Sequence, residues 1–436
     1  MSAIPKFALL LAACEPGPGA ESTVPGRWEA RAPVPEARTE VSVTTDGSVI
    51  YLIGGFRAEA GGSPSAPRAM FAYDPAADRW TTREEIPEGV NHAGFAAAGG
   101  KLYIVGGFRG NTFSPTGAVR IYDPAARIWR DGATMLTPRG ALAVAVVDGK
   151  IHAIGGNAAG GAGLPPHEHG APQADNSVGT HEVYDPAADA WTRLAPMPTP
   201  RNHLGAAVIA GKIHAVGGRV SGNMELTTHE IYDPAAGSWA AGPPVPTGRS
   251  GIAVVAHRGL VYVFGGETVR TMSAKTFDAA ERFDPATGRW ERLPPMPTAR
   301  HGLGAASFGE AIHVLSGGPQ PGFAFGTANE RLVELSGRAA RSRRVSRVSA
   351  DWPMARRRAL PGGARLTERL AGQTRERLSG LGHVWLKRGI GMTPDVGDVL
   401  VVTGRLLPIG QSLGHAGTLT LSQGSNWLGV AGSRSG

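Results

Sequence analysis

Polar side chains that could bind or exchange protons recur at one kind of position in this sequence. The stretch "RNHLGAAVIAGKIHAVGG" (201–218) shows the pattern: an Arg-Asn-His cluster, a small and β-branched run, a Gly-Lys turn, a second apolar run and Gly-Gly. The same position recurs six times along the chain, as Arg38, Val90, Arg139, Arg201, Arg249 and Arg300. Guanidinium groups bind carboxylates in a bidentate manner, so the pattern predicts recognition of an anion.

Imidazole and carboxylate groups stand close to these arginines. Further candidates follow either the arginine position or the Gly-Gly pair: Arg57, His92, Arg109, His203, Arg219, Glu267 and His301. His203, His301 or Glu267 could carry protons in general acid–base chemistry. One alternative stays open, because an arginine repeated at one position of every unit can instead bond carbonyl groups of the neighbouring unit.

A repeat positions these side chains. Gly-Gly pairs recur at intervals of about 50 residues, which is typical of repeat architectures. They begin at Gly54, Gly106, Gly155, Gly217, Gly265 and Gly317. Tyr-Asp-Pro or Phe-Asp-Pro follows five of the pairs, and a tryptophan follows each of those at a constant spacing (Trp80, Trp129, Trp191, Trp239 and Trp290).

Each unit is predicted to form four short strands, since its runs are β-branched or apolar and are bounded by Gly, Pro and Asp. In the unit quoted above the strands are expected at 204–210, 212–216, 229–233 and around Trp239. The Gly-Gly pairs are expected where backbones approach closely. The repeated Tyr, Phe and Trp are expected in the core between units.

The Gly-Gly pair followed by an aromatic residue and a tryptophan resembles the kelch repeat. That resemblance implies an all-β, six-bladed kelch-type β-propeller over residues 27–336. The last unit has no tryptophan, whereas Trp28 precedes Arg38 at the spacing that Trp290 has to Arg300. The N-terminal strand is therefore expected to close the ring. In a kelch blade the first strand is innermost, so the arginines would surround one mouth of the central channel.

The two ends of the chain differ from the repeat. Residues 1–14 are expected to be a secretory signal that ends in a lipobox-like Leu-Ala-Ala-Cys14, where Cys14 would be lipidated. Residues 15–26 are expected to be a tether. Residues 337–436 are Arg-rich and are expected to be a low-order extension. The protein is expected to be an extracytoplasmic, membrane-anchored bacterial lipoprotein, with a cytoplasmic location as the alternative.

Two functions are compatible with these features. The first is non-enzymatic recognition of a protein partner, or of an anionic or carbohydrate ligand, at the Arg-rich mouth; kelch domains of animal adaptor proteins bind acidic peptides through Arg at this strand start. The alternative is a mutarotase or epimerase of an acidic sugar, as in the kelch-type sialic acid mutarotases. We expect a monomer with no cofactor, metal or nucleic-acid partner. Cys14 lies outside the propeller, which disfavours the copper chemistry of galactose oxidase. In an insertion, His167-Glu168-His169 lacks a third metal ligand.

Overall fold

Strands are the only regular secondary structure among the residues that the computed structural model describes. These are residues 24–59, 63–158, 176–269 and 274–335, together with the backbone of 419–424 and 427–432. Within this part of the chain there is no helix long and apolar enough to cross a membrane.

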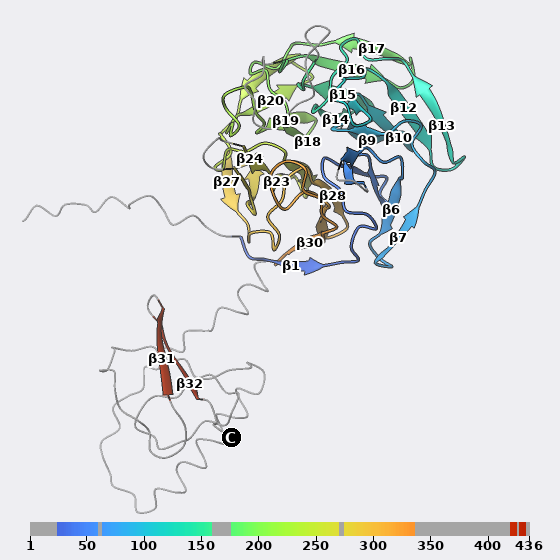
Figure 1. The fold of residues 1–436 in the computed structure, drawn as a ribbon. Helices are drawn as coiled ribbons and strands as arrows, with labels where there is room; N and C mark the ends of the chain where they lie inside the picture. Colours follow the sequence, from blue (N-terminus) through green and yellow to red (C-terminus); the bar gives the residue numbers. More distant parts are fainter. Residues whose placement is uncertain are drawn as a thin grey trace, which may run out of the picture. The chain divides into compact units, whose positions relative to one another are not determined.

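Six four-stranded antiparallel sheets form the blades of a propeller (Figure 1). From the inside outwards, the first three are β2 (Ser42–Thr45), β3 (Ile50–Ile53), β6 (Phe71–Asp74) and β7 (Arg79–Thr82); β9 (Gly94–Ala98), β10 (Lys101–Val105), β12 (Val119–Asp123) and β13 (Ile128–Gly132); and β14 (Ala143–Val147), β15 (Lys150–Ile154), β16 (His181–Asp185) and β17 (Ala190–Arg193). The other three are β18 (Gly205–Ile209), β19 (Lys212–Val216), β20 (His229–Asp233) and β21 (Ser238–Ala241); β22 (Ala253–His257), β23 (Leu260–Phe264), β26 (Ala280–Asp284) and β27 (Arg289–Arg292); and β28 (Gly304–Phe308), β29 (Ala311–Leu315), β30 (Asn329–Glu334) and β1 (Gly26–Ala30).

The predicted ring closure is confirmed. Strand β1 comes from the N-terminal side of the propeller and completes the sixth blade by pairing with β30, with Trp28 opposite Leu332. The first strands of successive blades also contact one another in a closed circle, including β2 with β28. The closing strand covers the outer edge of β30, so the sixth blade has four strands like the others.

Aromatic pairs fill the space between blades, as the repeat predicts. Tyr73 packs on Trp80 with ring centroids 4.9 Å apart, and the Trp80 indole N–H donates to the carbonyl of Ala32 in the strand connection before that blade. The equivalent indole of Trp28 donates to Pro294 and so ties the closing strand to the fifth blade. The indoles of Trp80 and Trp28 therefore both combine apolar burial with a satisfied donor.

The Gly-Gly pairs are structural, also as predicted. Gly217 and Gly218 have φ angles of 63° and 102°. A Cβ on Gly218 would lie 2.8 Å from the carbonyl oxygen of Asn202. Both the left-handed backbone and the close approach exclude a side chain at this position.

The tail forms a unit of its own. Residues 347–436 separate from 1–346 by their contacts, and β31 (Leu419–Gly424) pairs with β32 (Trp427–Gly432) as an antiparallel hairpin that the repeat analysis did not anticipate. The expected signal sequence, Cys14 and most of the expected tether lie outside the described residues. The same is true of residues 336–418 and of His167-Glu168-His169.

Candidate functional site

In five blades a residue that follows the arginine position pairs with a residue that follows the Gly-Gly pair, and in the sixth blade it pairs with Gly318, the second glycine of the pair. The bridges are Thr39 with Phe56, Asn91 with Phe108, Gly140 with Asn157, Asn202 with Arg219, Ser250 with Glu267 and His301 with Gly318. The expectation that both positions share one end of the blade is therefore confirmed. These six bridges surround one mouth of the channel.

The five arginines themselves do not line that mouth. Arg38, Arg139, Arg201, Arg249 and Arg300 are all fully buried, with 0% exposure. Arg139 shows the shared arrangement: its guanidinium donates to the carbonyls of Thr137, Ala153 and Gly155 and to Glu182, at 2.8–2.9 Å. We call this arrangement the arginine cage.

The cage recurs with a glutamate on the third strand of its own blade. The pairs are Arg139–Glu182, Arg201–Glu230, Arg249–Glu281 and Arg300–Glu330. Arg38 uses Glu36 instead, two residues before it. Burial lowers the pKa of Arg249, and the adjacent Glu281 opposes that change. The geometry thus supports a structural role, because every one of these guanidinium groups already binds protein acceptors and cannot reach a ligand. The bonded carbonyls belong to the arginine's own blade, as those of Ala153 and Gly155 do for Arg139, and not to the neighbouring unit as expected.

A second ring of residues, one step further along the chain, faces the axis. Its members share a left-handed backbone with φ between 51° and 63°: Glu40, His92, Ala141, His203, Gly251 and Gly302. From His92 to Gly302, each backbone N–H donates to the carbonyl of the preceding member, for example His203 to Ala141 at 2.9 Å. The N–H of Val41, which follows Glu40, closes the circle by donating to Gly302 at 3.1 Å. Three members carry ionisable side chains although this conformation favours glycine, which is strain of the kind found at functional sites.

The side chains of Glu40, His92 and His203 lie close to three further residues that the sequence predicted as candidates, Arg219, Glu267 and His301. We call the set the axial cluster: Glu40, His92, His203, Arg219, Glu267 and His301. Arg219 joins two of them, because its guanidinium donates to Glu267 at 2.8 Å and to Nε2 of His203 at 2.7 Å. His301 lies 3.5 Å from both Glu40 and Glu267. Burial raises the pKa of Glu40, and nearby His301 and Arg219 only partly oppose it.

Glycines make room for these carboxylates. A Cβ on Gly302 would lie 2.8 Å from the carboxyl carbon of Glu40. Position 302 could therefore not carry a side chain while Glu40 keeps its place.

A group of phenylalanines lies beside the axial cluster and shares His92 with it. We call it the phenylalanine group: Phe56, Phe108, Phe113 and Phe323. The His92 ring lies 5.6 Å from Phe108 and 6.0 Å from Phe56. Phe56 and Phe108 are buried, whereas Phe323 is 40% exposed. The mouth thus offers an apolar half next to a polar half.

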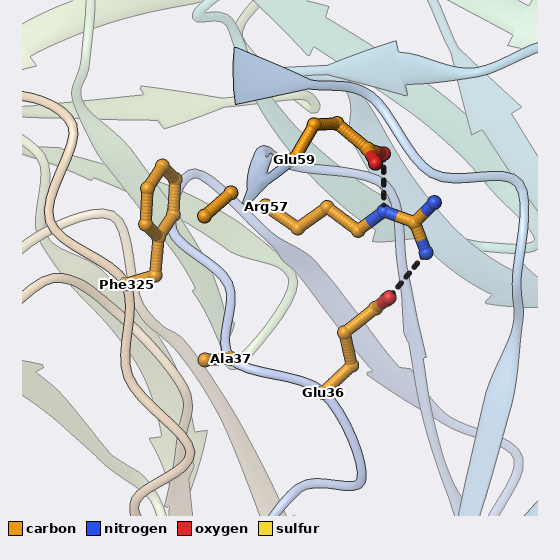
Figure 2. A pocket seen from close by; sticks show the side chains of 6 residues that line it. Glu36, Ala37, Arg57, Glu59 and Phe325 are labelled. Atoms are coloured by element: carbon orange, nitrogen blue, oxygen red, sulfur yellow. Dashed lines mark hydrogen bonds and ion pairs between the residues drawn. The ribbon is translucent and has the colours of Figure 1, made fainter. Parts of the chain in front are cut away.

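The two remaining predicted arginines lie at the edge of this mouth and are partly exposed. Arg57 bonds Glu36 at 2.5 Å and Glu59 at 2.8 Å, where it lines a pocket of about 410 Å³ with Phe325 (Figure 2). Arg109 lies 3.9 Å from Glu88. Each exposed cation of the mouth therefore stands beside a carboxylate.

Glu40, Phe113 and Phe323 were not among the predicted site residues. Glu40 had a signal in the sequence, because it occupies the position of His92 and His203 in its own unit. Phe113 and Phe323 lie in connections between the second and third strands, where the units differ in length and do not align.

Comparison with known proteins gives independent evidence for the kelch repeat. The sequence profile of the kelch motif matches residues 90–136, 200–246 and 248–297. This chain contains kelch repeats. The kelch-like protein terF of Aspergillus terreus is 27% identical over 322 residues, covering 71% of this chain and 68% of that protein. An F-box/kelch-repeat protein of Arabidopsis thaliana is 33% identical over 162 residues, 34% of this chain and 39% of that protein.

The structural comparison supports the same fold. The kelch propeller resembles the solved structure of YjhT with a TM-score of 0.56 at 13% identity, covering 69% of this chain and 96% of that one. Kelch propellers generally mediate protein interactions. Kelch-like ECH-associated protein 1A of Danio rerio is 31% identical over 117 residues, but the match spans only 17% of its length and 27% of this chain.

Proposed function

We propose that this kelch propeller is a non-enzymatic recognition module that binds a protein partner at the mouth built by the axial cluster and the phenylalanine group. The observation that carries the proposal is the phenylalanine group. Its buried members form a floor, and Phe323 is one of only three exposed large apolar side chains among the described residues. Protein interfaces are enriched in aromatic anchors that a polar rim surrounds.

The charged side chains of the mouth favour some classes of partner over others. Support for a strongly anionic ligand is weak, because the arginine cage is closed and Arg219 already pairs with Glu267. A partner with an apolar side chain for the phenylalanine group and hydroxyl, amide or amine donors for Glu40 matches these groups better. A neutral carbohydrate has the same two features, since sugars also stack on aromatic rings while donating hydrogen bonds.

Site-specific photo-crosslinking tests the protein-partner proposal. Phe323 is replaced by a photoreactive benzoyl-phenylalanine in cells that make the protein, and adducts are identified by mass spectrometry. Ile128 is the matched control, because it is 60% exposed but lies on β13, the outermost strand of the second blade. The proposal requires a discrete protein adduct from position 323 and none from position 128. Adducts from position 128 alone, or no adduct from position 323, would contradict it.

A second candidate function is mutarotation of an acidic sugar such as a sialic acid. The observation in its favour is that His203, His301 and Glu267 all belong to the axial cluster beside Glu40. Imidazole and carboxyl groups at such short distances can deliver and remove the protons that ring opening and closure require. For this function, Arg219 would have to release Glu267 and bind the carboxylate of the sugar instead.

Exchange between the anomers of sialic acid, followed by NMR, tests this second function. If it holds, the protein accelerates exchange and Glu40→Gln or His203→Gln reduces the acceleration by about 100-fold. Glu59→Gln is the control, because Glu59 is exposed and contacts only the edge of the mouth. Exchange at the uncatalysed rate would leave recognition as the function.

We also propose that Cys14 anchors the protein to a membrane outside the cytoplasm. The support is the lipobox-like sequence before it. Partition of the full chain into a detergent phase tests the anchor, with Cys14→Ser as the comparison. Equal partition of both proteins into the aqueous phase would contradict it.

A further inference from the structure

Three imidazoles of the axial cluster are held in one tautomer. Nδ1 of His92 lies 2.7 Å from Oδ1 of Asn91, whose amide nitrogen donates to Gly110 at 2.8 Å. Because that amide orientation leaves Oδ1 as the acceptor, Nδ1 of His92 must carry the proton.

The other two histidines follow the same rule. Nδ1 of His203 contacts Oδ1 of Asn202, whose amide nitrogen donates to Ser177 at 2.7 Å. Nδ1 of His301 lies 3.2 Å from the carbonyl oxygen of Gly318. Protein metal sites hold their histidines this way, with one ring N–H on a carbonyl and the other nitrogen toward the ion.

The Nε2 atoms consequently point into the cluster. Nε2 of His203 accepts from Arg219. Nε2 of His92 lies 3.2 Å from Glu40, and Nε2 of His301 lies 3.5 Å from both Glu40 and Glu267. A nitrogen lone pair that faces carboxylate oxygens is repulsive unless a positive charge lies between them, and that charge is either a proton or a metal ion.

Two polar atoms of the axial cluster make no hydrogen bond although they are buried. They are Oε1 of Glu40, in a side chain that is 8% exposed, and Nε2 of His301, in a side chain with 0% exposure. Buried polar atoms without a partner are rare and call for a cause. Ligand atoms about 2.1 Å from a tetrahedral zinc ion lie about 3.4 Å from one another. The two 3.5 Å separations around His301 match that spacing.

We propose that Glu40, Glu267 and His301 bind one divalent first-row transition-metal ion at the axis of the propeller. Their ligand atoms all lie within 4.8 Å of one another, and all three side chains are buried. An imidazole ligand favours Zn²⁺ and its neighbours over Mg²⁺ and Ca²⁺, which prefer oxygen. Three protein ligands leave a coordination position open, as in zinc sites that bind a water or a substrate. Glu40 also connects the site to His92, which contacts the phenylalanine group.

Calorimetric titration of the EDTA-treated full chain with Zn²⁺ tests the site. We expect one Zn²⁺ per chain, and at least a 100-fold weaker affinity in Glu40→Gln and in His301→Asn. Two control variants should keep the wild-type affinity: Glu59→Gln, an exposed carboxylate of the mouth, and His257→Asn, whose imidazole bonds Ser307 away from the cluster. Zn²⁺ should also raise the melting temperature of the wild type and of both controls, and leave that of the two site variants unchanged.

Other outcomes would overturn the proposal. If His167→Ala/His169→Ala abolishes Zn²⁺ binding, the ion binds in the insertion and not at the axis. If Mg²⁺ binds as tightly as Zn²⁺, the site is not one for a transition metal. If no ion binds to a folded wild-type chain, the positive charge between His301 and the carboxylates is a proton. The photo-crosslinking result at Phe323 does not depend on any of these outcomes.

Discussion

Arg249 illustrates how one residue type can serve structure at a position where binding was expected. Its guanidinium donates to Thr247, Gly265, Val263 and Glu281, all within the same blade. The side chain links the segment before the first strand to the second and third strands, and it replaces water for three backbone carbonyls. Such a charge is stable only while its partners are in place.

Removing this guanidinium should therefore be costly. Arg249→Gln is expected to lower the free energy of unfolding by about 3 kcal/mol, because Glu281 is left buried without its counter-ion. Arg249→Met combined with Glu281→Met should recover much of that loss, since no charge is then left alone. Urea denaturation gives both values. Arg109→Gln is the control, because Arg109 is exposed and a change there should stay within about 0.5 kcal/mol.

Buried histidines outside the axial cluster should make stability depend on pH. Burial lowers the pKa of His152, His214 and His313 to about 4, and that of His181 to about 3. The unfolded chain binds these protons near pH 6.5, so the unfolded state gains protons first as the pH falls. The stabilisation is complete above pH 6.5 and is lost toward pH 4, by about 2 kcal/mol at pH 5 for one such histidine.

Unfolding experiments at pH 7, 6 and 5 measure this dependence, and NMR signals of the imidazoles report the protonation directly. His313→Phe is a matched variant, because a phenyl ring can keep the contact with Tyr73 without titrating. It should show a shallower loss of stability on acidification. Titration of these histidines near pH 6.5 in the folded protein would contradict the account.

At the scale of elements, we expect the closing strand β1 to be the least stable part of the ring. In five blades the fourth strand follows the third along the chain, whereas β1 is held to β30 by strand pairing and by Trp28. The Trp28 ring packs on Phe264 at 5.8 Å and its indole N–H donates to Pro294.

Trp28→Ala should thus open the sixth blade before the others. We expect a loss of about 3 kcal/mol and faster hydrogen exchange in residues 329–334, because local opening exposes the backbone of β30. Trp80→Ala is the matched control, since β7 stays covalently connected to β6 through a short turn. Similar exchange in β30 for the two variants would show that Trp28 is not what holds β1 against β30.

Strands were predictable from the sequence because their signals are local. The expected strands at 212–216 and 229–233 have the bounds of β19 and β20, and the expected 204–210 exceeds β18 by one residue at each end. The role of Arg201 was harder to predict, because its partner Glu230 lies on the third strand. A signal existed in the recurrence of Glu182, Glu230, Glu281 and Glu330 on those strands. The convergence of Glu40 with His301 depends on closure of the whole ring, and no local pattern reports it.

At the scale of the whole molecule, the axial cluster exists only in the closed propeller. Glu40 comes from the first blade, His92 from the second, His203 from the fourth and Glu267 from the fifth. The arginine cages stabilise five of the six blades, and the backbone ring at the axis brings the ends of all six together. The cluster in turn contains a buried carboxylate and left-handed residues that cost stability. We therefore expect substitutions in the arginine cages to lower the free energy of unfolding and substitutions in the axial cluster to raise it.

The most direct measurement is the free energy of unfolding of Glu40→Gln in EDTA-treated protein, with Arg249→Gln alongside. Glutamine keeps the volume of Glu40 and carries no charge. Burial raises the pKa of the Glu40 carboxyl group, because the charged form is costly at this buried position. The account predicts that Glu40→Gln increases the free energy of unfolding by about 1 kcal/mol at pH 7, whereas Arg249→Gln decreases it by about 3 kcal/mol. If Glu40→Gln destabilises the protein as much as Arg249→Gln does, Glu40 is part of the architecture and the axial cluster is not the functional site.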